Sequence, residues 1–401
     1  MKKYILLLCG IAVTGLSDPG PLTLEQALEL ARKNSPELRA VRMHLQSAEK
    51  GVAAAGLRIN PELEFEAEGV GLDNDLSNEG EYALGISQEF QTGGKRKKAR
   101  TVARKSVGIA SQFVREKDIE LTEAVRHAFI VVMAMQEIRG VQAEQMQLGR
   151  AFVKVAKRHH KAGGGSELDV VQAELAMEEI VLSQTCYFSE LLAARIKLAS
   201  LLRLPVEELP ELTAPYYNLE VIENVVLHNS HPSLRRLEIE TEKVRAEAVR
   251  AKAEDTANIS LGAGYKYEAV DDNSSLIFSA SVPLSFSRRG RAEHAAGLLR
   301  ATAVESERTE VRRKLQSELT EVLALYKGVR AEVALLKNRL IPKAEQAHEL
   351  SRTGYDAGRF SWLELIEAQQ NLADIRIRYI ESLRDAHLAR AKIYKFMKEE
   401  I

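Results

Sequence analysis

The chain has 401 residues, and 28% of them are charged, with 56 basic against 57 acidic side chains and a formal net charge of −1. Such a balance argues against a protein whose overall charge recruits nucleic acid or an acidic partner. Aromatic residues make up only 5% of the chain, and Ala, Leu, Glu, Arg and Lys dominate its long helical stretches, which is typical of solvated helices rather than of a thick compact core.

Residues 1–17 have the pattern of a secretory signal peptide. Lys2 and Lys3 give a positive start, residues 4–13 are mostly apolar, and small residues follow up to Ser17. We therefore expect the chain to be exported.

The two cysteines give little evidence of covalent modification. Cys9 could be read as a lipid-attachment site, but Leu8 is large for the preceding position and the apolar run before it is very short. Cys186 alone would remain after cleavage, so the mature chain could form no internal disulfide. The sequence after the signal contains no apolar run of the roughly 18 residues that a spanning helix needs, so any membrane insertion would have to use strands.

The chain resembles itself across its two halves. Residues 160–174 are echoed by residues 355–369, about 195 positions later. Each half has the order helix, two strands, very long helix, tight turn and helix. We therefore interpret residues 18–212 and 213–401 as two structural repeats, with the tight turns at about 159–169 and 353–364.

Each repeat contains two consecutive segments in which apolar and polar residues alternate. We expect the two segments to pair as a hairpin, at about residues 60–90 in the first repeat and 257–286 in the second. In the first of these strands the polar face consists entirely of glutamates: Glu62, Glu64, Glu66 and Glu68.

The expected strands are about ten residues long, which is the length of a tilted transmembrane strand. Four strands cannot close a barrel, whereas three chains would supply twelve. Two half-buried hairpins on a soluble protein are the alternative interpretation of the same alternation.

The long helices are expected at about residues 95–158 and 289–351, each without a break and on the order of 95 Å long. In the second, apolar residues recur every 3.5 positions from Leu315 to Leu340, a spacing that favours a left-handed coiled coil. The shorter helices flanking each long one would pack against it end to end. A cytoskeletal or scaffold coiled coil is the alternative, against which export and the hairpins count.

The mature chain resembles the TolC family of outer-membrane efflux proteins over essentially its whole length, and within it the heavy-metal, CzcC-like branch. The resemblance rests on LTLEQALELA at 22–31, NSPEL at 34–38, SQEFQTGGKR at 87–96 and the repeated Gly-x-x-Ser-x-Leu turn.

This resemblance implies a mixed α and β membrane protein. It would be a homotrimer with a twelve-stranded outer-membrane β-barrel, continued in the periplasm by a long α-helical coiled-coil barrel. The implied partners are a periplasmic adaptor (membrane fusion) protein, an inner-membrane pump, which we expect to be of the RND type, and outer-membrane lipid. No cofactor and no nucleic acid are implied.

The resemblance also assigns a closed periplasmic gate to the two turns. Asp169 and Glu364 match the family's constriction acids, and Tyr355 matches its gating tyrosine. Arg359 lies one residue before the expected arginine, whose place Phe360 takes. Ordinary solvation and packing at the turns is the alternative for all of them.

The same turns would receive the adaptor. The residues that we expect there allow the turn, cap the next helix or offer large aromatic side chains: Gly163, Ser166, Gly358, Ser361, Phe360 and Trp362.

A cluster of basic residues follows the second strand of each of the two hairpins. Both clusters stand at helix N-termini, where cations oppose the helix dipole. We expect them to meet lipid headgroups at the membrane interface, with a plain solvated charge run as the alternative. They comprise Lys95, Arg96, Lys97, Lys98, Arg288, Arg289 and Arg291.

The glutamate stripe would line the lumen of the barrel, where it suits cationic cargo, although any polar residue would suffice there. His159 and His160 lack supporting ligands at useful spacing, so no metal site is expected. No catalytic constellation is recognisable, and we expect no enzyme. The sequence therefore predicts a passive outer-membrane exit duct for small molecules or metal cations. A duct for type I protein secretion and a periplasmic scaffold are the alternatives.

Overall fold

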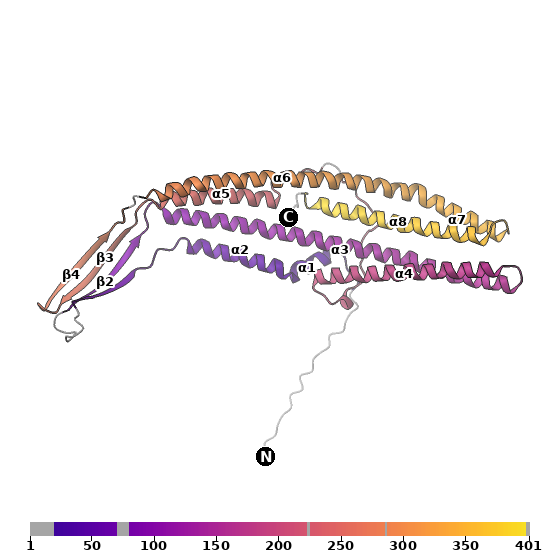
Figure 1. Cartoon of the computed structure of the whole chain (residues 1–401), viewed down its shortest axis with the longest axis horizontal. Coiled ribbons are helices and arrows are strands. Elements are labelled where there is room, and N and C mark those ends of the chain that lie inside the picture. The colour runs from indigo at the N-terminus through magenta and orange to yellow at the C-terminus, as the bar shows by residue number, and fades with distance from the viewer. Residues whose placement is uncertain (1–19, 70–79, 223–224, 285–286, 398–401) are drawn as a thin grey trace, which may run out of the picture. The chain divides into compact units, whose positions relative to one another are not determined.

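The computed structural model describes residues 20–69, 80–222, 225–284 and 287–397, so the expected signal peptide and Cys9 lie outside the described residues. Within those ranges the chain is mostly helical and carries one four-stranded sheet (Figure 1). Among the helices of these ranges, none is both long and apolar enough to cross a lipid bilayer.

The elements follow each other in the order helix, strand, strand, long helix, helix, and this order occurs twice. The helices are α1 (Leu24–Asn34), α2 (Pro36–Ala54), α3 (Lys95–Lys161), α4 (Glu167–Leu202), α5 (Pro232–Ala253), α6 (Arg289–Leu335), α7 (Ile341–Asp356) and α8 (Trp362–Tyr394). The strands are β1 (Glu62–Glu68), β2 (Glu81–Phe90), β3 (Ile259–Glu268) and β4 (Asn273–Ser281), and short helical turns lie at Val206–Glu208 and Leu336–Leu340.

The chain forms two compact units. One unit holds the sheet, α2, α5 and the first parts of α3 and α6. The other holds α1, α4, α7, α8 and the parts of α3 and α6 that start at Glu120 and Glu321.

The sheet is antiparallel throughout, with strand order β1-β2-β3-β4, so the two hairpins join through β2 and β3. In this register Phe65 pairs with Leu84, and Leu84 pairs with Tyr265. The apolar residues of neighbouring strands therefore gather on one face, because strand side chains alternate between faces. That face is exposed on the chain: Leu63, Phe65, Leu84, Leu276 and Phe278 each expose at least 53% of their area.

The fourth strand is shorter than expected. Alternation continues to residue 286 in the sequence, but β4 ends at Ser281, which pairs with Ser260 near the start of β3. Pro283 has no N–H to donate to a ladder, which explains why regular pairing does not continue there.

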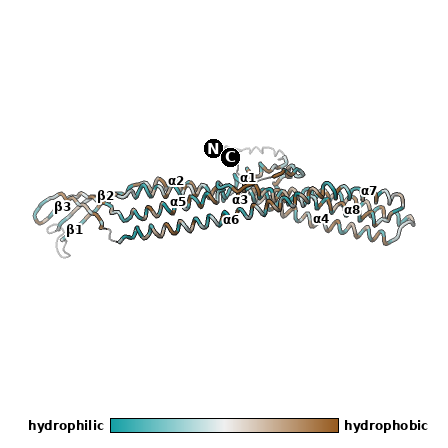
Figure 2. The backbone as a smooth tube through the Cα atoms, turned by 90° about the horizontal axis from the view of Figure 1, so that it is seen from above, coloured by the Kyte–Doolittle hydropathy of each residue, from teal (hydrophilic) through white to brown (hydrophobic). Residues whose placement is uncertain are grey.

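The core of the second unit surrounds the middle of α3. Val125, Phe129, Val132 and Ile138 are at most 1% exposed there and pack with α1 and with α4 and α8 residues. Figure 2 is brown where α1 meets α3. Hydrophobic burial of this kind is the main force holding such elements together.

The segment after α4 is held on α8 by hydrogen bonds of Tyr216. The Tyr216 hydroxyl donates to the carbonyl of Ile380 at 2.7 Å, and His387 Nε2 lies 2.6 Å from the carbonyl of Tyr216. Burial lowers the pKa of His387, so the neutral ring that donates from Nε2 is the favoured form.

The second long helix runs from Arg289 to Asp356 without interruption but contains one irregular turn, which the sequence analysis did not anticipate. The 3.5-residue repeat is mostly buried from Leu319 through Leu336, with Val329 half-buried; a π-helical turn then spans Leu336–Leu340, and Leu340 is 36% exposed. The buried position moves to Ala344. Pro342 explains the irregular turn, because it lacks an N–H and its ring collides with the carbonyl four residues earlier in a regular α-helix.

Candidate functional site at the helix tips and the sheet

The turn between α3 and α4, here called the first tip, is built by glycine and serine. Gly163 has φ +77°, a backbone conformation that glycine adopts without a steric cost. Ser166 caps α4: its Oγ accepts from the N–H of Asp169 at 3.1 Å, and Asp169 Oδ2 accepts from the N–H of Ser166 at 2.9 Å. The Asp169 carboxylate is therefore part of a capping box.

The other two glycines of the first tip make room for His159. A Cβ on Gly164 would lie 2.8 Å from Nε2 of His159, and one on Gly165 would lie 3.0 Å from its Nδ1. His160 Nδ1 lies 3.1 Å from the carbonyl of Gly165. The last turn of α3 also carries Arg158 and Lys161, so this tip is polar and basic.

The turn between α7 and α8, the second tip, has the same backbone design. Gly358 has φ +69°, and Ser361 caps α8. Glu364 Oε2 accepts from the N–H of Ser361 at 2.7 Å and from its hydroxyl at 2.8 Å. These two hydrogen bonds, the backbone one first, lower the pKa of Glu364.

Aromatic side chains distinguish the second tip from the first. The Phe360 ring covers Gly354, whose added Cβ would lie 2.1 Å from Cδ2 of the ring. Trp362 packs edge-on against Phe152 of α3, with ring centroids 4.9 Å apart, and its ring lies 5.5 Å from that of Tyr355. The indole N–H is buried without a hydrogen-bond partner within the described structure.

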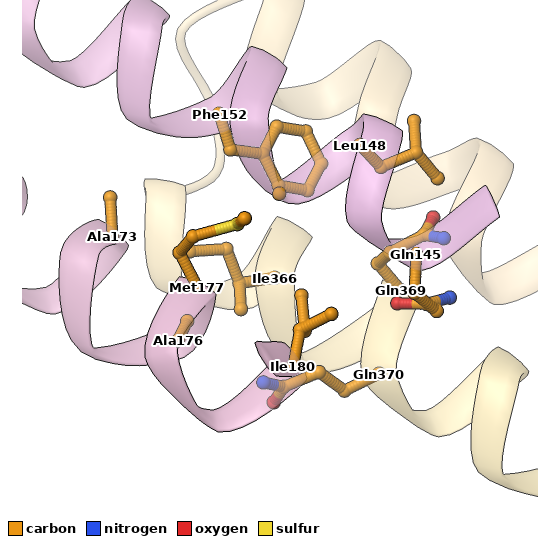
Figure 3. A pocket seen from close by; sticks show the side chains of 11 residues that line it. Gln145, Leu148, Phe152, Ala173, Ala176, Met177, Ile180, Ile366, Gln369 and Gln370 are labelled. Carbon is orange, nitrogen blue, oxygen red and sulfur yellow. The ribbon is translucent and has the colours of Figure 1, made fainter. Parts of the chain in front are cut away.

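A small cavity of about 10 Å³ lies beside this aromatic contact, between α3, α4 and α8. Figure 3 shows Phe152 and Met177 above it, and the amides of Gln145 and Gln369 at one side. Both glutamines are buried, and Gln369 Oε1 has no partner in the described part of the chain. The volume is at the lower limit for one water molecule.

The expected gate residues are only partly brought together. Tyr355 lies against Trp362, while Asp169 and Glu364 each belong to the cap of their own helix. Arg359 is exposed and has no ion pair or hydrogen bond from its guanidinium to any described residue.

Two contacts that join α8 to α3 could not be inferred from the sequence. One is Phe152, which no motif marks. The other is Arg376 on α8, which bridges Glu144 of α3 at 3.1 Å and Glu345 of α7 at 3.2 Å. The alternation of charge along these helices is the only signal for such a bridge, and it does not single out a pair.

The four glutamates of β1 all lie exposed on one face of the sheet. Glu64 accepts from the Ser87 hydroxyl at 2.9 Å. Next to Glu64 this face carries glycines, since Glu64 pairs with Gly85 and Gly85 pairs with Gly264. The face also holds Lys266, which pairs with Glu81 and Glu268. One face of the sheet is thus apolar, and the other carries more acidic than basic residues.

The first basic cluster contains one buried member. Lys95 is 6% exposed, and its Nζ lies 2.8 Å from Asn258 Oδ1 and 3.3 Å from Glu254. It therefore joins the start of α3 to the segment between α5 and β3. Arg96 and Lys98 are half-buried and Lys97 is exposed; Lys98 donates to the carbonyl of Gly93.

The second basic cluster is exposed throughout. Arg288 has φ +48°, Arg289 pairs with Glu293 at 2.8 Å, and Arg291 is exposed. Asp255 accepts from the N–H of Gly290 at 2.7 Å, so a carboxylate already stands at the N-terminus of α6.

The described residues contain no group of three or more His, Cys, Asp or Glu side chains that could hold a metal ion.

The comparisons with known proteins agree with this architecture. The chain is 25% identical over 388 residues to the cobalt-zinc-cadmium resistance protein CzcC of Cupriavidus metallidurans, covering 94% of this chain and 90% of CzcC. It is 22% identical over 385 residues to the pyoverdine export outer membrane protein OpmQ of Pseudomonas putida, covering 87% and 80% of the two chains.

Solved structures give the same fold. CusC, whose crystal structures concern folding and transmembrane channel formation, superposes with a TM-score of 0.77 at 16% identity, covering 92% of this chain and 91% of CusC. The outer membrane protein VceC of Vibrio cholerae gives a TM-score of 0.73 at 16% identity, covering 93% and 95%.

The model of the family "outer membrane efflux protein" matches residues 27–202 and 226–397, one segment in each half of the chain. Proteins of this family are channels rather than enzymes, and they work in the outer membrane and periplasm together with an adaptor and an inner-membrane pump. The chain belongs to the outer membrane efflux protein family and is the outer-membrane channel component of a tripartite efflux system.

Proposed function

We propose that three copies of this chain form a passive exit duct for divalent metal cations. The strands of the three chains would close a twelve-stranded barrel in the outer membrane, and the helices would continue it into the periplasm. The observation that carries this proposal is the sheet, which has one exposed apolar face and one acidic face; among the described residues, its edge strands β1 and β4 are each paired on one side only. Edge strands left open are a hazard that barrel closure removes.

The helices support the same assembly. Large apolar side chains lie exposed along α4, each at least 43% exposed, at spacings that repeat roughly every helical turn. A single chain leaves them uncovered, so we assign them to contacts with a second copy: Leu168, Val171, Leu175, Leu182, Phe188, Leu192 and Ile196.

The internal duplication fits a threefold channel. The order of elements occurs twice, and the family model matches each half separately. Residues 18–212 and 213–401 would then be two related repeats per chain, giving six similar hairpins and six tips around one axis in the trimer.

The two tips would close the periplasmic end. In a threefold assembly, Asp169 and Glu364 each become a ring of carboxylates, which concentrates cations and repels anions. Their roles in the capping boxes hold them in place at the start of α4 and α8. Tyr355 and Arg359 complete this proposed gate.

The adaptor would dock on the same turns, with Phe360 and Trp362 as anchors and Gly163, Ser166, Gly358 and Ser361 shaping the surface. Phe360 is 43% exposed, whereas Trp362 is half-buried in the chain. We therefore expect Phe360 to contribute the larger share of the contact. The pump would be of the RND type.

Lipid headgroups would meet the basic residues that face outward near the sheet. Among them we include Arg96, Lys97, Lys98 and the second cluster Arg288, Arg289 and Arg291. We leave out Lys95, because its ammonium is already paired inside the chain.

The cargo assignment rests on two observations. The glutamate stripe of β1 would place twelve carboxylates in the lumen of a trimer, a number that follows from four glutamates in each of three chains. The chain is also similar over 94% of its length to a cobalt-zinc-cadmium resistance protein.

The test is the metal and drug sensitivity of a deletion strain carrying variants on a plasmid. We expect loss of the gene to cause hypersensitivity to zinc, cobalt or cadmium, and the wild-type chain to restore tolerance. Changing Glu62, Glu64, Glu66 and Glu68 together to Gln should restore less, while the matched change to Asp should restore fully. Sensitivity confined to dyes, detergents and antibiotics would overturn the cargo assignment.

A further inference from the structure

The unit that carries the sheet also contains a positively charged pocket, which is separate from the glutamate stripe of β1. A pocket of about 400 Å³ opens where α2 and α5 end and α3 begins. Part of its wall is apolar and comes from two separate segments: Ala54, Leu57, Ile59, Ala99, Val102 and Ala103.

The rest of the wall is cationic. Lys95, Arg58 and Arg250 line the pocket together with the carboxylate of Glu254. The ammonium of Lys95 is buried and held by Glu254 and Asn258, so it is a fixed positive charge. Three cations against one carboxylate leave the pocket positively charged.

The two arginines of the pocket are available to a ligand, as far as the described part of the chain shows. Neither Arg58 nor Arg250 forms an ion pair or side-chain hydrogen bond with any residue that the structure describes. Two such guanidinium groups on one pocket form the donor set that phosphate oxygens accept, since each guanidinium offers two parallel N–H donors.

The surroundings of the pocket favour a lipid over a soluble anion. Arg58 precedes β1, Lys95 follows β2 and Glu254 precedes β3, so the pocket adjoins the helix-side ends of three strands. Leu57 on its wall is 70% exposed. A charged centre beside exposed apolar side chains matches a phosphate joined to a glycerol backbone and acyl chains.

We propose that this pocket binds the headgroup phosphate of an anionic phospholipid, with Arg58 and Arg250 contacting the phosphate and the apolar wall contacting the glycerol and the first acyl carbons. The proposal rests on the proposed function in one respect: the strands must cross the membrane, so that their helix-side ends lie at the headgroup level of the periplasmic leaflet.

The experiment measures lipid binding to the purified full-length protein in detergent by native mass spectrometry, with phosphatidylglycerol, phosphatidylcholine or inorganic phosphate added. The double variant Arg58→Gln/Arg250→Gln removes both guanidinium groups. Lys50→Gln/Lys252→Gln is the matched control, because it removes the same charge from exposed positions near the ends of α2 and α5 that do not line the pocket.

We expect wild type and control to bind phosphatidylglycerol equally, and the arginine double variant to bind it at least about tenfold more weakly. Equal binding by all three proteins would overturn the proposal. If inorganic phosphate bound as tightly as phosphatidylglycerol or displaced it, the pocket would be a site for a free anion, and the lipid assignment would be wrong. A loss of binding in the control as well would show a diffuse charge effect and would also overturn the proposal.

Channel currents in planar bilayers keep this test separate from the proposed function. We expect the arginine double variant to conduct like the wild type, because the pocket is not placed in the gate or the lumen. If neither the wild type nor the gate variant Asp169→Asn/Glu364→Gln gave a current, the proposed duct would be wrong, whatever the lipid result.

Discussion

The two tips share one backbone design and differ in what surrounds it. In both tips, a glycine with positive φ follows the end of the first helix. A serine then caps the second helix together with an acidic residue three positions later. At the first tip an imidazole lies over glycines. At the second, Trp362 is packed against Phe152 of α3. The comparison teaches that the capping sequence determines the turn, while side chains outside the motif determine what the turn is fastened to.

This difference suggests a division of roles. The second tip is fastened to α3 by the Trp362 contact, so its movement must break a contact with another helix. Farther along α8, Arg376 also pairs with Glu144 of α3. The first tip has an ion pair between Lys157 and Glu174, at 2.7 Å, which joins only its own two helices.

The largest expected effect comes from Trp362. Trp362→Ala removes the contacts with Phe152 and Tyr355, and we expect a destabilisation of about 2 kcal/mol, below the roughly 3–5 kcal/mol of a fully buried aromatic, because Trp362 is half-buried. Trp362→Phe keeps most of the packing and removes an N–H that has no partner, so it should cost little. The loss of helical circular dichroism on heating in detergent measures both. Equal losses for the two variants would contradict the packing account.

Glycine substitutions at the two tips should differ in size. Gly354→Ala places a methyl group against the Phe360 ring, and overpacking of this kind costs about 1–3 kcal/mol. Gly164→Ala meets only the ring of exposed His159, which can move, so we expect about 0.5 kcal/mol or less.

A double-mutant cycle sharpens that comparison. Phe360→Ala should recover much of the stability lost in Gly354→Ala, whereas His159→Ala should change Gly164→Ala little. The same thermal measurement reports both cycles. No coupling between Gly354 and Phe360 would mean that the ring does not cover that glycine.

The caps should contribute equally, since their geometry is shared. Ser166→Ala and Ser361→Ala each remove a side-chain acceptor for a helix N–H, at a cost of about 1 kcal/mol. Hydrogen exchange of the first-turn amides of α4 and α8 would measure the two losses separately. Faster exchange at only one of the tips would break the equivalence.

The smallest expected effect is a pH dependence at the second tip. Hydrogen bonds from Ser361 lower the pKa of Glu364 below its ordinary value of 4.5. The folded state therefore binds this proton less readily than the unfolded state. The resulting stability is fully present above about pH 4.5 and is lost as the pH falls through the lower folded pKa.

Titration of the Glu364 carboxyl by NMR of a labelled protein would check this, with Ser361→Ala as the variant that returns the pKa towards 4.5. A Glu364 pKa at or above 4.5 in the wild-type protein would contradict the capping geometry.

Local patterns predicted the turns and strands, because their causes are local. Gly163, Ser166 and their counterparts act through neighbouring backbone atoms, and alternation alone placed β1 on an acidic and an apolar face. The pairing of Trp362 with Phe152 could not be predicted, since the two residues are far apart in sequence and neither belongs to a motif.

Two features that the sequence analysis missed have physical explanations. The apolar repeat through Leu336 drew attention away from Pro342, whose missing N–H accounts for the π-helical turn inside the continuous helix. Lys95 looked like one member of an exposed charge run, but its burial depends on Asn258 and Glu254, which a run of basic residues does not reveal.

The most direct test of the central claim is the ion current through the purified protein in a planar lipid bilayer under a salt gradient. We expect stepwise channels that prefer cations, and a weaker preference with retained conductance in Asp169→Asn/Glu364→Gln, because the proposed carboxylate rings are then neutral. A preference for anions, or an absence of current from both the wild-type protein and this variant, would contradict the account.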